Sequence, residues 1–569
     1  MSQSRNPYRD PWWERVLDLG LPPRPTGAPS SDEDTFDVIV VGGGMAGYVS
    51  AIFTREQGGS VVILEAAESA GGTAYKSGAG MWVPDNSIMR ARGIPANREW
   101  AMHHMARLAY PEAYGANAER MGLGQLEYDL IATYYETGSA VMDKLHELGM
   151  GLMEFPSFTG EFEAMVEYHG DTEHGFGAHL APQQPNGAYG AGVHLIEQLS
   201  AIATRLGAEL WTGHRVTDAI TNDAGEVIGV SAETSSGTST LYARKGVIFA
   251  TGGYPHNPEL AHEHFPGGLY GSCAVPTARG DFVAIGQRLG AELGNMGEGW
   301  GTEHPLEQML VDREVVEHVG VFPGDSVLMV NAAGHRIVNE KLIYHERSKV
   351  HFERDAGGGL PSHLTFLIFD DFIVDDQTSQ PNKWPSPQRH EPWVISADTL
   401  EGLAQEIDGR LAGYGERVAG VRLAPDFASA LAKTVARFNE LARGGVDEDF
   451  HRGETAVEMD WTGPSHVEND KNPTMWPLDD GPYHCIILAG SVLDTCGGPK
   501  TTVDGEVLRA DGTTIGGLYG AGNCVASAAG AGYWSGGSTL GPAAAFAYRA
   551  ALHVAAAPAR ALPSTNSAA

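Results

Sequence analysis

The chain has 569 residues, of which 42% are hydrophobic, and its formal net charge is −34. This length allows roughly two to four domains with a large buried core, and the hydrophobic share is ordinary for a globular protein. The strong negative charge argues against nucleic acid and against an anionic membrane surface as partners.

The four cysteines form no C-x-x-C pair, so we expect neither a disulfide framework nor a metal site. Residues 1–35 hold Trp12, Trp13 and a proline-rich run, which indicates an extension and linker before the first strand. The N-terminus has no apolar signal region, and no apolar run is long enough for a transmembrane segment. These features predict a cytoplasmic protein.

Residues 37–65 carry the most informative motif. Four apolar residues end in a glycine turn, a helical segment follows, and a second apolar run over 60–64 ends in an acid. This order is typical of a dinucleotide site, in which glycines admit a pyrophosphate at a helix N-terminus and the acid binds a ribose. The candidate ligands are Gly42, Gly44, Met45, Ala46, Gly47, Glu65 and Ala66.

Two further glycine turns follow later in the chain. We expect a helix over 195–206, a strand over 208–216 that includes Val216, and a meander over 226–253 that ends in Ala250, Thr251 and Gly252. A hairpin over 505–515 leads to the third turn, which contains Gly522 and Asn523. Pro542 then marks the first turn of a helix over 542–555. In a doubly wound sheet such turns meet at one edge, so the second can face the first.

We therefore expect an α/β protein in which one Rossmann-like nucleotide domain is built from both ends of the chain, with an inserted α+β substrate domain. The expected divisions are an N-terminal extension 1–35, a nucleotide domain of 36–304 and 481–557, a substrate domain 305–480, and a disordered tail 558–569, which is rich in Ala, Pro and Ser.

At residues 71–84 the chain resembles the flavoprotein superfamily that includes fumarate reductases and 3-ketosteroid dehydrogenases. The segment contains Gly71, Gly72, Thr73, Ser77, Gly78, Ala79 and Gly80, and the second and third glycine turns match the same family. The resemblance implies FAD, non-covalently bound, as the cofactor. It adds Ser538 and Leu540 to the candidate cofactor contacts.

The late segment Tyr533-x-x-x-Gly537 and the stretch from Arg336 to Tyr344 resemble 3-ketosteroid Δ1-dehydrogenases. The resemblance implies 1,2-desaturation beside the ketone of a steroid, with proton abstraction by a tyrosine and hydride transfer to flavin N5. Tyr344 is the candidate base, and the Tyr533 hydroxyl and the Gly537 amide are candidates for the ketone oxygen. A tyrosine base needs a lowered pKa, for which the nearby cations are Lys341, His345 and Arg347.

Phe158, Trp534 and Ser535 are the candidate substrate contacts. Phe158 stands where the family has a second active-site tyrosine, which leaves Tyr168 as a candidate substitute. The spacing of Tyr533 and Ser535 resembles the branch that desaturates the 4,5 bond. The alternatives are therefore a 3-ketosteroid 4,5-dehydrogenase, a fumarate- or enoate-type reductase, against which a missing arginine argues, and a non-enzymatic flavin or steroid binder. The expected partners are a small hydrophobic ketone and an external electron acceptor.

Overall fold

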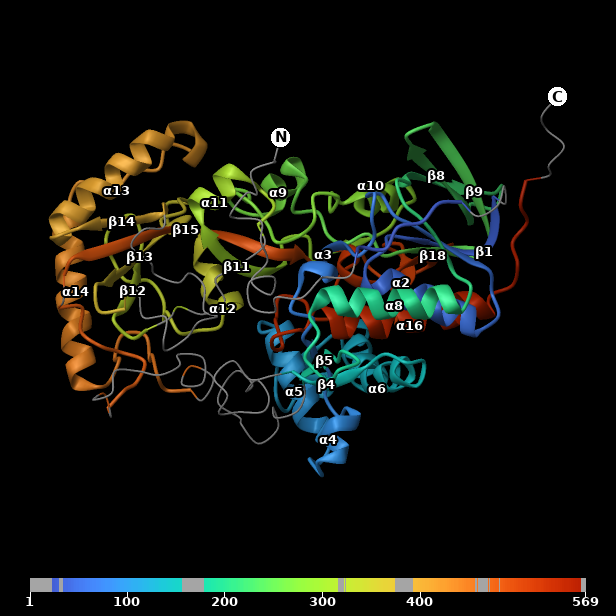
Figure 1. Ribbon diagram of the computed structural model, residues 1–569, viewed down its shortest axis with the longest axis horizontal. Helices are drawn as coiled ribbons and strands as arrows, with labels where there is room; N and C mark the ends of the chain where they lie inside the picture. The colour runs from blue at the N-terminus through green and yellow to red at the C-terminus, as the bar shows by residue number, and fades with distance from the viewer. Residues whose placement is uncertain are drawn as a thin grey trace.

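The structure is a computed structural model, and it describes residues 23–29, 34–155, 179–315, 322, 324–373, 392–455, 458, 469, 471–479 and 481–563. Two large sheets lie at opposite ends of the long axis of the molecule (Figure 1). The first and last parts of the chain build one end, and the middle part builds the other.

The first sheet has the strand order β17-β18-β9-β1-β2-β6, and β8 joins β7 to β9. The five strands from β18 to β6 are parallel, whereas β17, β7 and β8 pair antiparallel with their neighbours. The strands are β1 Thr35–Val41, β2 Val61–Leu64, β6 Glu209–Trp211, β7 Arg215–Thr221, β8 Val227–Thr234, β9 Gly237–Phe249, β17 Glu506–Leu508 and β18 Thr514–Gly520. The apolar runs of β1 and β2 are buried on both faces, as parallel strands between two layers are.

Three helices pack together beside this sheet: α2 (Met45–Glu56), α8 (Gly192–Arg205) and α16 (Leu540–Ala556) (Figure 1). Most alanines of α16 are buried, so the helix can approach α2 closely. The helix α10 (Asp281–Arg288) contacts β7. The expected α/β fold and the antiparallel meander are confirmed.

The second sheet is antiparallel and has the order β11-β15-β13-β12, with β14 also paired to β15. Its strands are β11 Gly299–Pro305, β12 Val327–Val330, β13 Leu364–Asp370, β14 Val394–Ala397 and β15 Tyr483–Thr495, and its helices are α11 Leu306–Val311, α13 Leu400–Tyr414 and α14 Phe427–Gly444. Apolar residues of α13 and α14 form one core with β12, β13 and β15. Because β11 and β15 come from outside 305–480, the limits of the inserted domain stay a prediction.

A third, small sheet has β5 between β3 and β4, and Figure 1 shows β4 and β5 near α5 and α6. Its strands are β3 Met81–Trp82, β4 Leu152–Glu154 and β5 His179–Pro182; β10 Leu293–Gly294 pairs with β16 Gly498–Pro499. The remaining helices are α3 Gly72–Lys76, α4 Ser87–Ala91, α5 Arg98–Ala109, α6 Gln125–Glu147, α9 Pro258–His264 and α12 Tyr344–Ser348. Within the described residues, none of the helices has the length and apolar character needed to cross a membrane.

The expected single strand over 208–216 is wrong, because a turn divides it into β6 and β7. Gly213 has a φ of +68°, which favours glycine, and its N–H bonds to the carbonyl of Ala67. The next N–H, of His214, bonds to the carbonyl of Glu65. The turn thus joins the strand to the loop that follows the expected ribose-binding acid.

The segments at both ends of the described chain make defined contacts. Residues 23–29 run beside β6, where the Gly27 carbonyl accepts bonds from the N–H and the hydroxyl of Thr212. After α16, the N–H of Arg560 bonds to the carbonyl of Arg244 at 2.6 Å. Part of the segment expected to be a disordered tail, residues 558–563, therefore packs against β9.

Candidate active site

The first glycine turn brings β1 into α2 with no space for side chains at two of its glycines. Gly42 has a φ of +107°, and a Cβ there would lie 2.3 Å from the Ala250 carbonyl oxygen. A Cβ on Gly47 would lie 1.9 Å from the Gly42 oxygen. In contrast, a Cβ on Gly44 would meet no described residue within 4 Å. The chain therefore packs tightly around the turn and leaves space in front of Gly44, as a pyrophosphate requires.

The N-terminus of α2 faces this space without a cap. Gly44 is its N-cap residue, none of the described side chains caps it, and its first turn contains no acid. Met45 and Ala46 thus present backbone N–H groups and the positive end of the helix dipole. A helix N-terminus of this kind suits an anionic group.

The carboxylate of Glu65 lies next to the same turn. It accepts hydrogen bonds of 2.8 Å from the N–H of Gly43 and from the N–H of Ala67. Burial raises the pKa of the Glu65 carboxyl, and these amides and the charge of Arg24 oppose the rise. Each oxygen keeps a second lone pair for a ribose hydroxyl. Ala66 follows in the same loop, and Val216 is buried in β7 after the His214 turn.

The second and third glycine turns meet the first, as the sequence predicted for the second. The Ala250 N–H bonds to the Val41 carbonyl at 2.7 Å, so Thr251 and Gly252 follow beside Gly42. A Cβ on Gly522 would lie 3.2 Å from the Cβ of Ala46. The three turns therefore converge at the N-terminus of α2.

Asp494 links the second turn to the third. Its carboxylate accepts hydrogen bonds from the Gly253 N–H at 3.2 Å and from the Asn523 amide nitrogen at 3.0 Å. Asn523 in turn accepts a bond of 3.0 Å from the Trp300 indole N–H. Burial raises the pKa of the Asp494 carboxyl to about 6. Reasoning from the sequence missed Asp494, which no motif distinguishes.

Residues 71–80 close another side of the site. The Gly71 N–H bonds to the Gly43 carbonyl at 2.8 Å, and a Cβ on Gly72 would lie 3.7 Å from the Gly44 Cα. The Thr73 hydroxyl accepts the Val275 N–H at 3.3 Å. Further on, the Ser77 hydroxyl accepts the Ala79 N–H at 3.1 Å, and the Gly78 carbonyl accepts a bond from Tyr189. Gly80 lies next to Gly537, one of the three expected catalytic groups, since a Cβ on Gly537 would lie 2.4 Å from the Gly80 carbonyl oxygen.

A cleft lies between the third turn and the start of α16. Trp300, Gly522, Asn523, Thr539 and Pro542 are among the residues that line it. The Trp300 ring lies 5.6 Å from the Tyr533 ring, centroid to centroid. Ser538 and Leu540 flank Thr539 at this end of α16. The space in front of Gly44 and the N-terminus of α2 suit the diphosphate of a dinucleotide.

Tyr344 and Tyr533 come together although 188 residues separate them in the chain. Their hydroxyl oxygens are 2.7 Å apart, and the Gly537 N–H donates to the Tyr533 oxygen at 3.2 Å. Both side chains are buried, and Gly537 has a φ of +89°. The structure thus brings the three expected catalytic groups to one point, at the meeting of the two large parts of the molecule.

The expected lowering of the Tyr344 pKa by neighbouring cations is wrong in this structure. Burial and the contact with Tyr533 raise the pKa of Tyr344 well above its usual value, and burial raises that of Tyr533. Lys341 bonds instead to backbone carbonyls, among them that of Phe322 at 2.6 Å. Arg347 pairs with Glu303 at 2.7 Å. Burial lowers the pKa of His345 to about 4, so its ring is neutral at pH 7.

Of the three expected substrate contacts, Trp534 lies in the core. Its ring stacks on that of Tyr134 at 5.1 Å, and its N–H bonds to the Met105 carbonyl. These contacts favour a packing role over the expected substrate role. The Ser535 hydroxyl lies 2.9 Å from Nε2 of His179, whose pKa burial lowers to about 3. Phe158 and Tyr168 lie outside the described residues.

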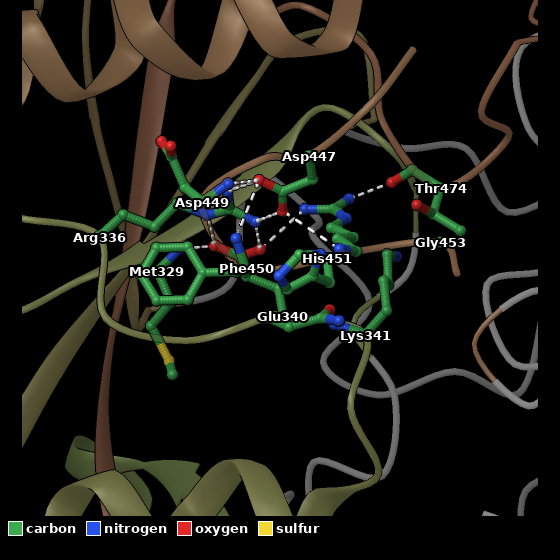
Figure 2. A network of polar contacts seen from close by, with 12 residues as sticks. Met329, Arg336, Glu340, Lys341, Asp447, Asp449, Phe450, His451, Gly453 and Thr474 are labelled. Atoms are coloured by element: carbon green, nitrogen blue, oxygen red, sulfur yellow. Dashed lines mark hydrogen bonds and ion pairs between the residues drawn. The ribbon is translucent and has the colours of Figure 1, made fainter. Parts of the chain in front are cut away.

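A buried ion network holds the segment that leads to Tyr344. Arg336 bonds to both carboxylate oxygens of Glu340, at 2.9 and 2.7 Å, and to both of Asp447, at 3.0 and 2.8 Å. Arg452 bonds to Glu340 at 3.0 Å from a third direction. Figure 2 shows Arg336 between the two carboxylates. Burial alone would raise the pKa of Glu340, but Arg336 and Arg452 outweigh it and hold that pKa below its usual value.

Known proteins resemble the chain over most of its length. A family model described as an FAD binding domain matches residues 37–540. A 3-oxosteroid 1-dehydrogenase of Mycobacterium tuberculosis is 30% identical, over 91% of this chain and 98% of that protein. A 4-oxocyclohexanecarboxylate 2-dehydrogenase of Sinomonas cyclohexanicum is 28% identical, over 91% and 92%. The crystal structure of a 3-ketosteroid Δ1-dehydrogenase of Sterolibacterium denitrificans, in complex with 1,4-androstadiene-3,17-dione, superposes with a TM-score of 0.75 at 23% identity, over 92% of this chain and 100% of that chain.

Proposed function

We propose that this protein desaturates a ring ketone, by preference the 1,2 bond of a 3-ketosteroid. The chain belongs to the FAD binding domain family and is an FAD-dependent oxidoreductase related to 3-oxosteroid 1-dehydrogenases. One relative is named for a 3-oxosteroid and another for 4-oxocyclohexanecarboxylate, and both names describe the dehydrogenation of a ring ketone. The shared chemistry is removal of hydrogen from two neighbouring ring carbons beside a carbonyl group.

The observation that carries the proposal is the meeting of Tyr344, Tyr533 and the Gly537 N–H. Desaturation beside a ketone needs a base for the α-proton and donors for the oxygen that becomes negative. Two hydroxyls and an amide N–H at 2.7 and 3.2 Å supply one base and two donors in a buried place. A site that merely binds a flavin or a steroid needs no such arrangement.

In the proposed reaction, the ketone oxygen accepts hydrogen bonds from the Tyr533 hydroxyl and the Gly537 N–H. These donors stabilise the enolate as its charge grows and make the α-proton more acidic. Tyr344 takes that proton. FAD, when bound, supplies the acceptor for the hydrogen and the electron pair that leave the β-carbon.

The raised pKa of Tyr344 shapes this proposal. At neutral pH both tyrosines carry their protons, so only a small fraction of Tyr344 is ionised and able to act as the base. The rate of the chemical step should therefore rise as the pH rises above neutral.

Ser535 favours a second candidate, a 3-ketosteroid 4,5-dehydrogenase. Its hydroxyl is two residues from Tyr533 and bonded to His179 at 2.9 Å. A fumarate- or enoate-type reductase remains the third alternative. The external electron acceptor, the non-covalent state of FAD and a cytoplasmic location stay predictions.

Product analysis tests the proposal. The purified protein would be incubated with an artificial electron acceptor and saturated or 4-ene 3-ketosteroids, and in parallel with 4-oxocyclohexanecarboxylate. We expect a product that has lost two hydrogens, and its double-bond position by NMR separates 1,2 from 4,5 desaturation. Fumarate reduction by the reduced protein, with no turnover of any ring ketone, would refute the proposal.

A further inference from the structure

Residues 23–29 precede the part of the chain that the FAD family model matches, 37–540, yet they pack on the nucleotide side of the first sheet. The Pro25 carbonyl accepts the Ala70 N–H at 2.8 Å, and the Gly27 carbonyl accepts the Thr212 N–H at 3.0 Å. A Cβ on Gly27 would lie 1.9 Å from the Leu210 oxygen. The segment, which we call the strap, thus bridges the loop after β2 and the end of β6.

The strap places Arg24 beside two expected cofactor segments. The guanidinium carbon lies 4.2 Å from the centre of the Tyr75 ring, in α3 just after Gly71 and Gly72. Its charge also opposes the effect of burial on the Glu65 carboxyl. A guanidinium above an aromatic ring makes a cation–π contact and can still direct N–H groups at anionic oxygens.

The glycine turns themselves contain no cation. Between residues 36 and 75 the sequence has a single Lys or Arg, Arg55, which bonds to the carbonyls of Leu206 and Gly59. Neither the second nor the third glycine turn contains Lys or Arg. Lys76 forms a 2.7 Å ion pair with Glu314.

FAD carries a doubly negative diphosphate into a place that already holds the buried Glu65. The N-terminus of α2 offers only about half a positive charge. A chain with a net charge of −34 adds no general attraction for an anion. A further positive charge close by would therefore strengthen the binding of FAD, and the strap supplies one.

We propose that the strap is part of the FAD site, and that Arg24 is the cation that holds the adenosine diphosphate half of FAD. The strap closes over that half from the side of β6 and α3. This inference rests on FAD binding by the family and is independent of the reaction proposed above.

FAD affinity of the flavin-free protein tests the inference. Arg24→Met removes the charge at nearly constant length, Arg24→Lys keeps it, and Gly27→Val displaces the strap through the Leu210 oxygen. Arg422→Met is the matched control, because Arg422 is an exposed arginine that pairs with Asp408 in another part of the molecule. Titrations would use FAD, FMN and ADP at low and at high salt, with the melting temperature of the flavin-free protein measured alongside.

We expect the Kd for FAD to rise at least tenfold in Arg24→Met and in Gly27→Val, and less in Arg24→Lys. The affinity for ADP should fall in parallel, the affinity for FMN should stay unchanged, and high salt should narrow the difference from wild type. The melting temperature should stay unchanged in Arg24→Met, whereas we expect it to fall in Gly27→Val, which moves the strap away from β6. Unchanged FAD affinity in Arg24→Met would overturn the inference. So would an equal loss for FAD and FMN together with a lower melting temperature, because Arg24 would then only stabilise α3.

Discussion

Replacing Tyr344 by phenylalanine removes one oxygen atom from the point where the two large parts of the molecule meet. That oxygen lies 2.7 Å from the Tyr533 hydroxyl oxygen, and the ring around it is buried. The Tyr533 oxygen keeps its bond from the Gly537 N–H at 3.2 Å. The substitution therefore removes the proposed base and leaves the proposed donors for the ketone oxygen in place.

The expected effects on rate and stability differ in size. A general base contributes about 10²- to 10⁴-fold to a rate, which is about 3 to 5 kcal/mol of barrier. A hydrogen bond between two neutral groups contributes only about 1 kcal/mol to folding. We therefore expect Tyr344→Phe to lose nearly all flavin reduction while the melting temperature falls by no more than about 4 °C.

Stopped-flow measurement of flavin reduction by the saturated ketone, from pH 6 to pH 10, would check this. Wild type should become faster as the pH rises, and the variant should lose that rise. Tyr519→Phe is the matched control, since Tyr519 is also buried and its hydroxyl bonds at 3.0 Å to His553, which lies in the last turn of α16, whereas the cleft lies at the start of that helix. Flavin reduction by Tyr344→Phe at the wild-type rate would refute the assignment of the base.

Three further predictions concern the donors, the cofactor turn and Asp494. Tyr533→Phe should lose about 2–4 kcal/mol in kcat/KM with normal flavin content, because one donor to the growing charge is lost; an unchanged kcat/KM would remove Tyr533 from the site. Gly44→Val should fold but purify without flavin, because its side chain enters the space in front of α2 and meets no protein atom; a yellow, fully loaded variant would contradict this. The Asp494 carboxyl has a pKa of about 6 when folded and about 3.9 when unfolded, so its burial destabilises the fold increasingly from pH 4 to pH 6. Asp494→Asn should remove this penalty and so raise the free energy of unfolding at pH 7 by up to about 3 kcal/mol, with little change at pH 4. Denaturant unfolding of wild type and variant at the two pH values would measure the difference.

The sequence alone predicts the nucleotide end of the molecule well, because its signals are local. Gly42 and Gly47 mark a turn whose geometry depends on a few neighbouring residues, and the apolar runs beside them identify buried parallel strands. The convergence of the three turns then follows from the rule that such turns share one edge of a sheet. The contact of Tyr344 with Tyr533 has no local signal, and only the resemblance to a known family pointed to it.

The sequence does not reveal which partner each charged side chain binds in the folded protein. Lys341 and Arg347 stand close to Tyr344 in the chain, yet backbone carbonyls and Glu303 bind them, so they do not lower the pKa of the tyrosine. Arg336 and Glu340 are four residues apart, a spacing that also suits an exposed helical pair, and nothing local reveals Asp447 as their buried third member. Residues 23–29 look like a linker because their packing depends on Thr212 and Ala70, which are distant in the chain.

The network of Arg336, Glu340, Asp447 and Arg452 has a consequence for how such a chain can diverge. Loss of one partner leaves a charge stranded in the interior, at a cost of about 3–5 kcal/mol, whereas replacing the whole set by apolar residues is often neutral. Substitutions at these four positions should therefore be inherited together, through intermediates that few proteins with ordinary stability survive. Single substitutions in the segment before Tyr344 are therefore strongly disfavoured, whereas the exposed ion pairs of the surface can change one residue at a time.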